Sequence, residues 1–117
     1  MIRALVLICI IFVLSGCYSI PNIEGFDQAA WDANDCQNPR INQQSLIMEQ
    51  QEKLLAEGQA EIKTLFGQPD EHELYNRNQK FFYYNLSPDS CESLYQMKRL
   101  SIRFDALDRV KEVLVIE

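Results

Sequence analysis

The sequence EIKTLFGQPD, residues 61–70, marks the point where the spacing of apolar residues changes. Before it, over residues 42–66, apolar residues recur at intervals of three, four and seven or eight, which predicts an amphipathic helical region. Gly67 and Pro69 then predict a helix stop, because glycine accepts the left-handed conformation of a C-cap and proline does not continue a helix. An interruption at Gly58 leaves two interpretations open: one weakened helix, or two helices joined near this glycine.

Beyond this stop, short strand-like segments replace the helical pattern. The segment KFFYYNL, residues 80–86, is aromatic on both faces of a strand, and RLSIRF, residues 99–104, alternates apolar with polar residues as a half-solvated strand does. Leu74 with Tyr75, and residues 110–116, predict the first and last strands. Helices followed by an antiparallel meander predict an α+β two-layer sandwich, with an N-terminal helix pair packed on a three- to four-stranded antiparallel sheet.

Length and charge limit the classes of function. The chain has 117 residues, which allows one domain and hardly a second. Its formal net charge is -6, and neither a basic stripe nor a cluster of arginines occurs. Nucleic acid is therefore not an expected partner, because binding to its phosphates depends on clustered positive charge.

The N-terminus has the composition of an export signal. Arg3 precedes an apolar run from Ala4 to Leu14, and small residues lead to Cys17. The run of about eleven residues is shorter than the roughly twenty that a membrane-spanning helix needs. Residues 1–16 are thus predicted to be a signal peptide; an ordinary secretory signal cut elsewhere, or an N-terminal membrane anchor, are the alternatives.

The sequence LSGC, residues 14–17, resembles the lipobox of bacterial lipoproteins. This resemblance implies a diacylglyceryl group on the thiol of Cys17, cleavage before it and an added acyl chain such as palmitate. We expect residues 17–25 to be a flexible lipidated tether and residues 26–117 to form one domain. Tyr18, where an aspartate would suggest retention at the inner membrane, favours an outer membrane location facing the periplasm.

Cleavage and lipidation leave Cys36 and Cys91 as the remaining thiols of the mature chain. Two cysteines in an oxidising compartment predict one disulfide. It would close a loop of about 55 residues and stabilise the domain by about 4 kcal/mol. A zinc site is the alternative, but His72 is the sole histidine and no C-x-x-C spacing occurs, so no metal is expected.

The order of these segments resembles the BamE (SmpA/OmlA) family of small outer-membrane lipoproteins. The resemblance rests on residues 61–70, on Phe82-Tyr83-Tyr84, and on residues 100–105 leading to the last strand, and it covers roughly residues 43–116. It implies an accessory role in the machinery that inserts β-barrel proteins into the outer membrane, and a fold similar to β-lactamase-inhibitor-like binding modules. The sequence Gly58-Gln59-Ala60 and the cysteine pair depart from the usual family pattern.

The aromatic strand is the candidate binding feature. In a two-layer fold one of its two aromatic pairs, either Phe81 with Tyr83 or Phe82 with Tyr84, points away from the helices, and exposed aromatic patches often mark interfaces. The candidate partner-contact residues are Phe82, Tyr84, Arg99 and Arg103.

Two other interpretations compete with a contact surface. A disulfide at Cys36 could hold Trp31 and Phe26 over the outward aromatic pair. The two arginines with Lys80 form a positive row that could face acidic lipids or a partner, although a solvated sheet face is the default interpretation.

The chain carries no pattern typical of catalysis. His72 lies between Glu71 and Glu73, but in a strand both carboxylates point to the opposite face, so we expect an exposed histidine. No Ser-His-Asp pattern and no glycine-rich phosphate loop occur. We expect no enzyme activity and no cofactor.

We therefore expect a membrane-anchored lipoprotein that acts as a non-catalytic, protein-binding accessory in envelope or outer-membrane protein assembly. Its partners would be the membrane, through the lipid anchor, and envelope proteins such as the barrel-assembly machinery. The alternatives are an inhibitor-like or other binding module for a secreted or periplasmic partner, and a lipoprotein that binds a small ligand or lipid in a pocket between the helices and the sheet.

Overall fold

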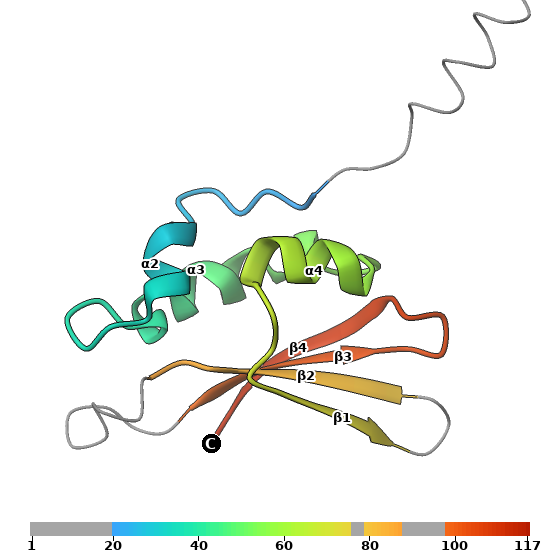
Figure 1. The fold of residues 1–117 in the computed structure, drawn as a ribbon. Helices are drawn as coiled ribbons and strands as arrows, with labels where there is room; N and C mark the ends of the chain where they lie inside the picture. Colours follow the sequence, from blue (N-terminus) through green and yellow to red (C-terminus); the bar gives the residue numbers. More distant parts are fainter. Residues whose placement is uncertain (1–19, 76–78, 88–97) are drawn as a thin grey trace, which may run out of the picture.

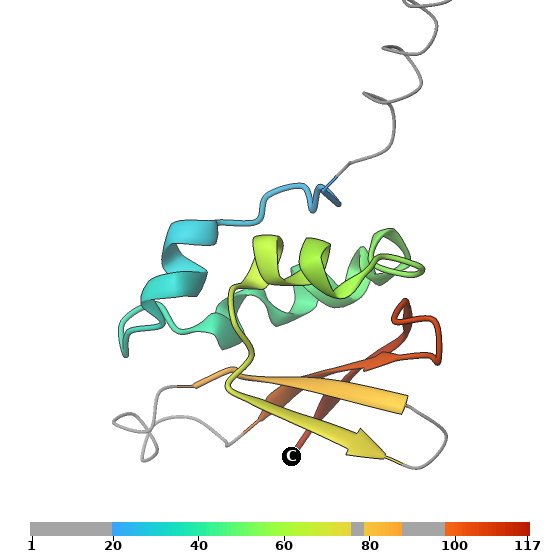
Figure 2. The same ribbon diagram turned by 45° about the vertical axis from the view of Figure 1, so that its right-hand side comes forward.

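A computed structural model of the chain describes residues 20–75, 79–87 and 98–117. Short helices form one layer and cover one face of a four-stranded antiparallel sheet (Figures 1 and 2). The predicted α+β two-layer fold, with the helices preceding the sheet, is confirmed. Cys17 and Cys91 lie outside the described residues.

The helical layer contains three α-helices and two 3-10 turns within the described part of the chain, and the sheet is a meander in the order β1-β2-β3-β4. The helical elements are α2 (Gln28–Ala33), η1 (Arg40–Gln43), α3 (Gln44–Glu49), η2 (Gln51–Lys53) and α4 (Gln59–Phe66). The strands are β1 (Glu71–Tyr75), β2 (Gln79–Asn85), β3 (Arg99–Phe104) and β4 (Val110–Ile116).

The amphipathic region is two helices, α3 and α4, and the break between them is wider than Gly58. In this break Ala56 has a positive φ of 68°, and its N–H donates to the carbonyl of Val110 at 2.8 Å. The N–H of Val110 donates in turn to the carbonyl of Glu57 at 2.8 Å. The start of β4 thus binds backbone groups that a continuous helix would use internally, which explains the interruption.

The predicted helix stop is confirmed at Gly67. Its φ is +80°, and its N–H donates to the carbonyl of Lys63 at 2.8 Å, so it closes the last turn of α4. After Pro69 the chain enters β1 at Glu71, earlier than the predicted Leu74. The sequence pattern did not predict the start of this strand because its first residues are charged or polar, and such residues are uncommon in strands.

Aromatic rings join the helical layer to the sheet. The Trp31 ring is fully buried and lies 4.9 Å from the ring of Phe66 and 6.0 Å from that of Tyr84, centroid to centroid. Trp31 Nε1 donates to the carbonyl of Phe66 at 2.8 Å, and the hydroxyl of Tyr84 donates to the carbonyl of Gly67 at 2.9 Å. The indole N–H of Trp31 and the hydroxyl of Tyr84 therefore both have hydrogen-bond partners.

Phe26 also contacts this cluster, on the helix side of the sheet. The suggestion that Trp31 and Phe26 cover the outward aromatic pair is therefore wrong.

The mostly buried side chain of Arg40, 11% exposed, is a second link between the layers. Its Nε donates to the carbonyl of Trp31 at 2.8 Å, and its guanidinium carbon lies 4.9 Å from the centre of the indole ring. Its Nη1 forms an ion pair with Asp70 at 2.9 Å and also donates to the carbonyl of Asn85. One guanidinium thus binds helix α2, the entrance to β1 and the end of β2.

Residues 20–27 form an N-terminal strap that crosses the helical layer (Figure 1). Ile23 is 3% exposed and belongs to the core. The side-chain amide of Gln50 accepts from the N–H of Glu24 and donates to its carbonyl, and Gln43 does the same with Asp27. The expected flexible tether over residues 17–25 is therefore docked on the domain from residue 20 onward.

Cys36 is disulfide-bonded. Its predicted partner, Cys91, lies outside the described residues, so the pairing of these two cysteines stays a prediction. Among residues 20–75, 79–87 and 98–117, no helix is long and apolar enough to span a bilayer.

Candidate functional site

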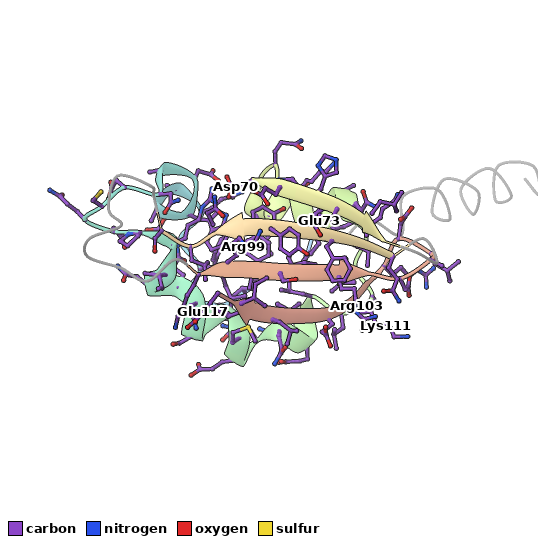
Figure 3. The ribbon with its side chains drawn as sticks, turned by 90° about the horizontal axis from the view of Figure 1, so that it is seen from below. Asp70, Glu73, Arg99, Arg103, Lys111 and Glu117 are labelled. Carbon is purple, nitrogen blue, oxygen red and sulfur yellow. The ribbon has the colours of Figure 1, made fainter. Side chains whose placement is uncertain are left out.

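The sheet face turned away from the helices is called here the open face (Figure 3). In an antiparallel sheet, residues that lie opposite each other point to the same side. The register places Glu73, Phe81, Arg103 and Glu112 in one row across the four strands. The next row is Glu71, Tyr83, Ser101 and Leu114. No described helix lies over these rows, so the open face is the candidate surface for contact with a partner.

The structure corrects half of the predicted contact set. Phe82 and Tyr84 are 5% and 0% exposed and point into the core, so they are not surface contacts. Phe82 lies opposite Ile102, whose side chain faces the helices, and the two must share that face. The outward pair is Phe81 with Tyr83. Arg99 and Arg103 do lie on the open face, as predicted (Figure 3).

Arg99 covers the ring of Tyr83. Its guanidinium carbon lies 4.5 Å from the ring centre, and its Nη1 forms an ion pair with Glu71 at 3.1 Å. The hydroxyl of Tyr83 donates to Glu73 at 3.3 Å. Tyr83 is only 6% exposed although it belongs to the open face, and Arg99 is one of the groups that cover it. A planar cation stacked on a ring and held by a carboxylate keeps its flat upper surface available for a partner.

The second arginine continues this arrangement along β3. Arg103 Nε lies 3.6 Å from a carboxylate oxygen of Glu112 on β4. The rings of Phe81 and Tyr83 stack 6.1 Å apart with an angle of 12° between their planes. Leu114 is 45% exposed beside the buried Ser101. Aromatic rings, arginines and an exposed leucine at the centre, with glutamates around them, form the composition that protein interfaces favour.

Lys80 does not belong to this surface. It lies on the helix side of β2, opposite Phe104, and its Nζ forms an ion pair with Asp108 at 3.2 Å. The predicted positive row therefore consists of the two arginines, each paired with a glutamate. This mixture of charges fits a protein surface better than a uniformly acidic lipid surface.

The other titratable groups that the sequence singled out lie apart from one another. His72 is exposed on the helix side of β1, opposite to the side of Glu71 and Glu73. Within the described ranges, no group of three or more His, Cys, Asp or Glu side chains could hold a metal ion. Burial raises the pKa of Tyr84 above its usual range; Arg40 opposes this rise and Asp70 adds to it. Tyr84 is thus a permanent hydrogen-bond donor in the core.

The centre of the space between the helices and the sheet is filled by side chains, and a groove remains at its β1 edge. The largest fully buried ones there are Trp31, Tyr84, Phe66 and Phe104. A lipid or small ligand enclosed at the centre of this layer would need a cavity there, and these rings occupy that position. The open face is therefore the stronger candidate site.

The sequence pattern did not indicate the roles of Arg40 or of Gln43 and Gln50, the two glutamines that hold the strap. An arginine in the mostly polar segment 34–44 gives no periodic signal, and glutamines at 43 and 50 are typical of solvated helix positions. The contacts that give these side chains their roles come from residues distant in the sequence, such as Asp70 and Asn85.

Comparisons of this chain with protein-family models, with curated proteins and with solved structures found no match. The resemblance to the BamE family and the role it implies are therefore carried forward as proposals.

Proposed function

We propose that this protein is a lipid-anchored, non-catalytic module that binds an envelope protein through the open face of its sheet. The observation that carries the proposal is the arrangement of Arg99 on Tyr83, with Arg103 and Phe81 beside them, on a sheet face that no described helix covers. Arginine and tyrosine dominate the binding energy of many protein interfaces. The lipobox-like sequence before Cys17 supports attachment to a membrane.

The strap supports a defined orientation on that membrane. Only three Cα–Cα steps separate Cys17 from Ile20, where the described chain begins, and they span at most about 11 Å. The strap lies on the helical layer, on the opposite side of the molecule from the open face (Figure 1). A lipid on Cys17 would thus hold the helical layer near the bilayer and direct the open face away from it, toward partners in the periplasm.

The first experiment is an affinity capture of the tagged, membrane-solubilised protein, read by mass spectrometry. The variants are Cys17→Ala, the pair Arg99→Glu with Arg103→Glu, and a control pair of equal charge change on exposed residues away from the open face, Lys53→Glu with Arg109→Glu. Capture of barrel-assembly or other envelope proteins by the wild type and the control, but not by the open-face pair, is the expected result. Equal capture by both pairs contradicts binding through the open face.

The Cys17→Ala variant tests the anchor separately. We expect it to fractionate as a soluble protein and to lose those partners that are themselves membrane-bound. Recovery of the same partners from both forms would show that binding does not need the lipid.

An inhibitor-like module is the second candidate, because a sheet face with arginine and aromatic side chains also suits the capture of one soluble enzyme. Tight capture of a single secreted or periplasmic enzyme by both the lipidated and the Cys17→Ala forms, without barrel-assembly components, would select this candidate.

A further inference from the structure

Strand β1 lies at one edge of the sheet, and part of its backbone is available for pairing. Just beyond the end of β2, the N–H of Leu86 donates to the carbonyl of Lys98 at 2.9 Å, which continues the register of β2 with β3, while the carbonyl of Tyr83 accepts from the N–H of Asp70 on the β1 side at 2.9 Å. Ladder hydrogen bonds alternate along a strand, so even-numbered residues of β2 bond β3 and odd-numbered residues bond β1.

This alternation fixes which groups of β1 face outward. Glu71 and Glu73 lie opposite odd-numbered residues of β2, so their N–H and C=O groups belong to the ladder. The N–H and C=O groups of His72 and Leu74 therefore point to the free edge, where no other described strand lies. Such an edge is a template for a further strand.

A groove of about 440 Å³ adjoins this edge on the helix side. Its floor is Phe82, and Leu74, 68% exposed, lies at its rim. Lys63 of α4 places its Nζ 5.5 Å from the centre of the Phe82 ring, and Lys80 contributes a second ammonium group. The lining residues are Gln59, Lys63, Gln68, Pro69, His72, Glu73, Leu74, Lys80 and Phe82.

The two sides of β1 therefore differ in charge. On the groove side lie Lys63 and Lys80. The Nζ of Lys80 also forms an ion pair with Asp108 at 3.2 Å. On the open-face side lie Glu71, which is 61% exposed, and Glu73, which also borders the groove. Side chains of an added strand alternate between these two sides, so the charges of a matching strand would alternate too.

We propose that the free edge of β1 binds an extended peptide segment of a protein partner as a fifth strand. Its acidic and apolar side chains enter the groove beside Lys63 and Leu74, and its basic side chains lie beside Glu71 and Glu73. Hydrogen bonds to His72 and Leu74 supply affinity that is independent of sequence, and the charge alternation selects the segment. This site adjoins the open face, with which it shares Glu71 and Glu73, but it does not rest on the function proposed above.

The test uses the full-length, isotope-labelled protein in detergent and a short blocked peptide that alternates Glu or Val with Lys. We expect binding to slow the amide hydrogen exchange of His72 and Leu74 and to shift the signals of Lys63 and Phe82. A peptide of the same composition, with its glutamates and lysines in separate blocks, should bind about tenfold more weakly because it loses the cross-strand charge pairs.

Two pairs of variants separate the contributions. Lys63→Glu should weaken binding about fivefold, and Lys111→Glu, an equal charge change on the opposite edge strand, should leave it unchanged. Leu74→Pro removes an N–H that faces the free edge, a position where strands tolerate proline, and should abolish the protection of His72; Leu74→Ala is the control that keeps the N–H.

Either of two results overturns the proposal. One is an absence of binding by the alternating peptide. The other is binding that shifts Tyr83 and Ser101 and leaves the exchange of His72 and Leu74 unchanged. The second result would assign peptide binding to the open face and would leave the proposed function intact, whereas failure of the affinity capture would leave the edge site intact.

Discussion

The two faces of strand β2 carry similar side chains with different surroundings. Phe82 and Tyr84 face the helices and are nearly inaccessible, and Phe81 and Tyr83 face the other way. On the helix side, Tyr84 contacts Trp31 and donates a 2.9 Å hydrogen bond to a backbone carbonyl. On the open face, Tyr83 is covered by the side chain of Arg99.

The comparison shows that low exposure has two different origins in this protein. Rings fixed by neighbouring helices cannot be uncovered without separating the two layers. The arginine over the ring of Tyr83 can move away from it, or can become part of an interface, at the expense of a solvent-exposed ion pair with Glu71. The first arrangement holds the fold together, and the second leaves a surface for binding.

The largest expected difference between the faces is in core packing. Trp31→Ala should lower the free energy of unfolding by about 3–5 kcal/mol, because it removes a fully buried indole and leaves a cavity among three aromatic rings. Phe81→Ala on the open face should lower it by only about 1 kcal/mol. Denaturant unfolding followed by far-ultraviolet circular dichroism measures both, and equal losses would remove the distinction between the faces.

The next largest effect is expected at the link between the layers. Arg40→Met keeps much of the side-chain volume but removes the hydrogen bonds to Trp31, Asp70 and Asn85, so we expect a loss of about 2 kcal/mol. Asp70 keeps its bond from the N–H of Asn85 at 2.7 Å, which limits the loss.

A double-mutant cycle with Asp70→Asn isolates the ion pair from the other contacts of Arg40. A coupling energy near zero would mean that the contacts of the guanidinium with Trp31, rather than its bond to Asp70, join the helices to the sheet.

Much of this architecture was predictable from the sequence, but which aromatic pair of β2 points toward the helices was not. The alternation in RLSIRF shows which residues of β3 point toward the helices. Residues that lie opposite each other in a sheet point to the same side, so the register of β2 with β3 decides which aromatic residues of β2 are buried. That register depends on the connection between residues 87 and 98, whose length alone does not fix it. Lys80 added a misleading signal, since it has the same parity as the buried Phe82 and Tyr84.

The candidate site was predictable only in part for a related reason. Arg99 and Arg103 were found because they alternate with apolar residues on one strand. Tyr83, which completes the site, lies on another strand and depends on the same register. The docked strap was missed because its contacts, Gln43 and Gln50, are single amides that any solvated helix could carry.

A smaller effect is expected from the raised pKa of Tyr84. The folded protein keeps this hydroxyl protonated, while in the unfolded chain it ionises near its usual pKa of 10.0. The contribution of this hydroxyl to the free energy of unfolding is therefore fully present below pH 10. Above pH 10 the free energy of unfolding falls by about 1.4 kcal/mol per pH unit, because only the unfolded chain loses the proton. Tyr84→Phe should flatten this alkaline limb of the unfolding free energy.

The measurement is the difference in unfolding free energy between wild type and Tyr84→Phe across the alkaline range. A constant difference below pH 10 that then declines as the pH rises is expected, since only the wild type loses stability through this group. A difference that stays constant throughout would show that the hydroxyl ionises equally in both states.

The smallest effect on stability, and the sharpest on binding, is expected at Arg99. Its side chain is one-third exposed and its partner Glu71 is more so, hence Arg99→Ala should change the unfolding free energy by less than about 1 kcal/mol. Arg99→Lys keeps the charge but loses the planar group stacked on Tyr83. If capture of the envelope partner fails with both variants while both stay folded, the stacked guanidinium is itself the binding element. If Arg99→Lys binds normally, charge alone suffices. If Arg99→Ala instead destabilises the protein as much as Arg40→Met, the open face is as structural as the buried one, and the binding surface must be sought at the edge of β1.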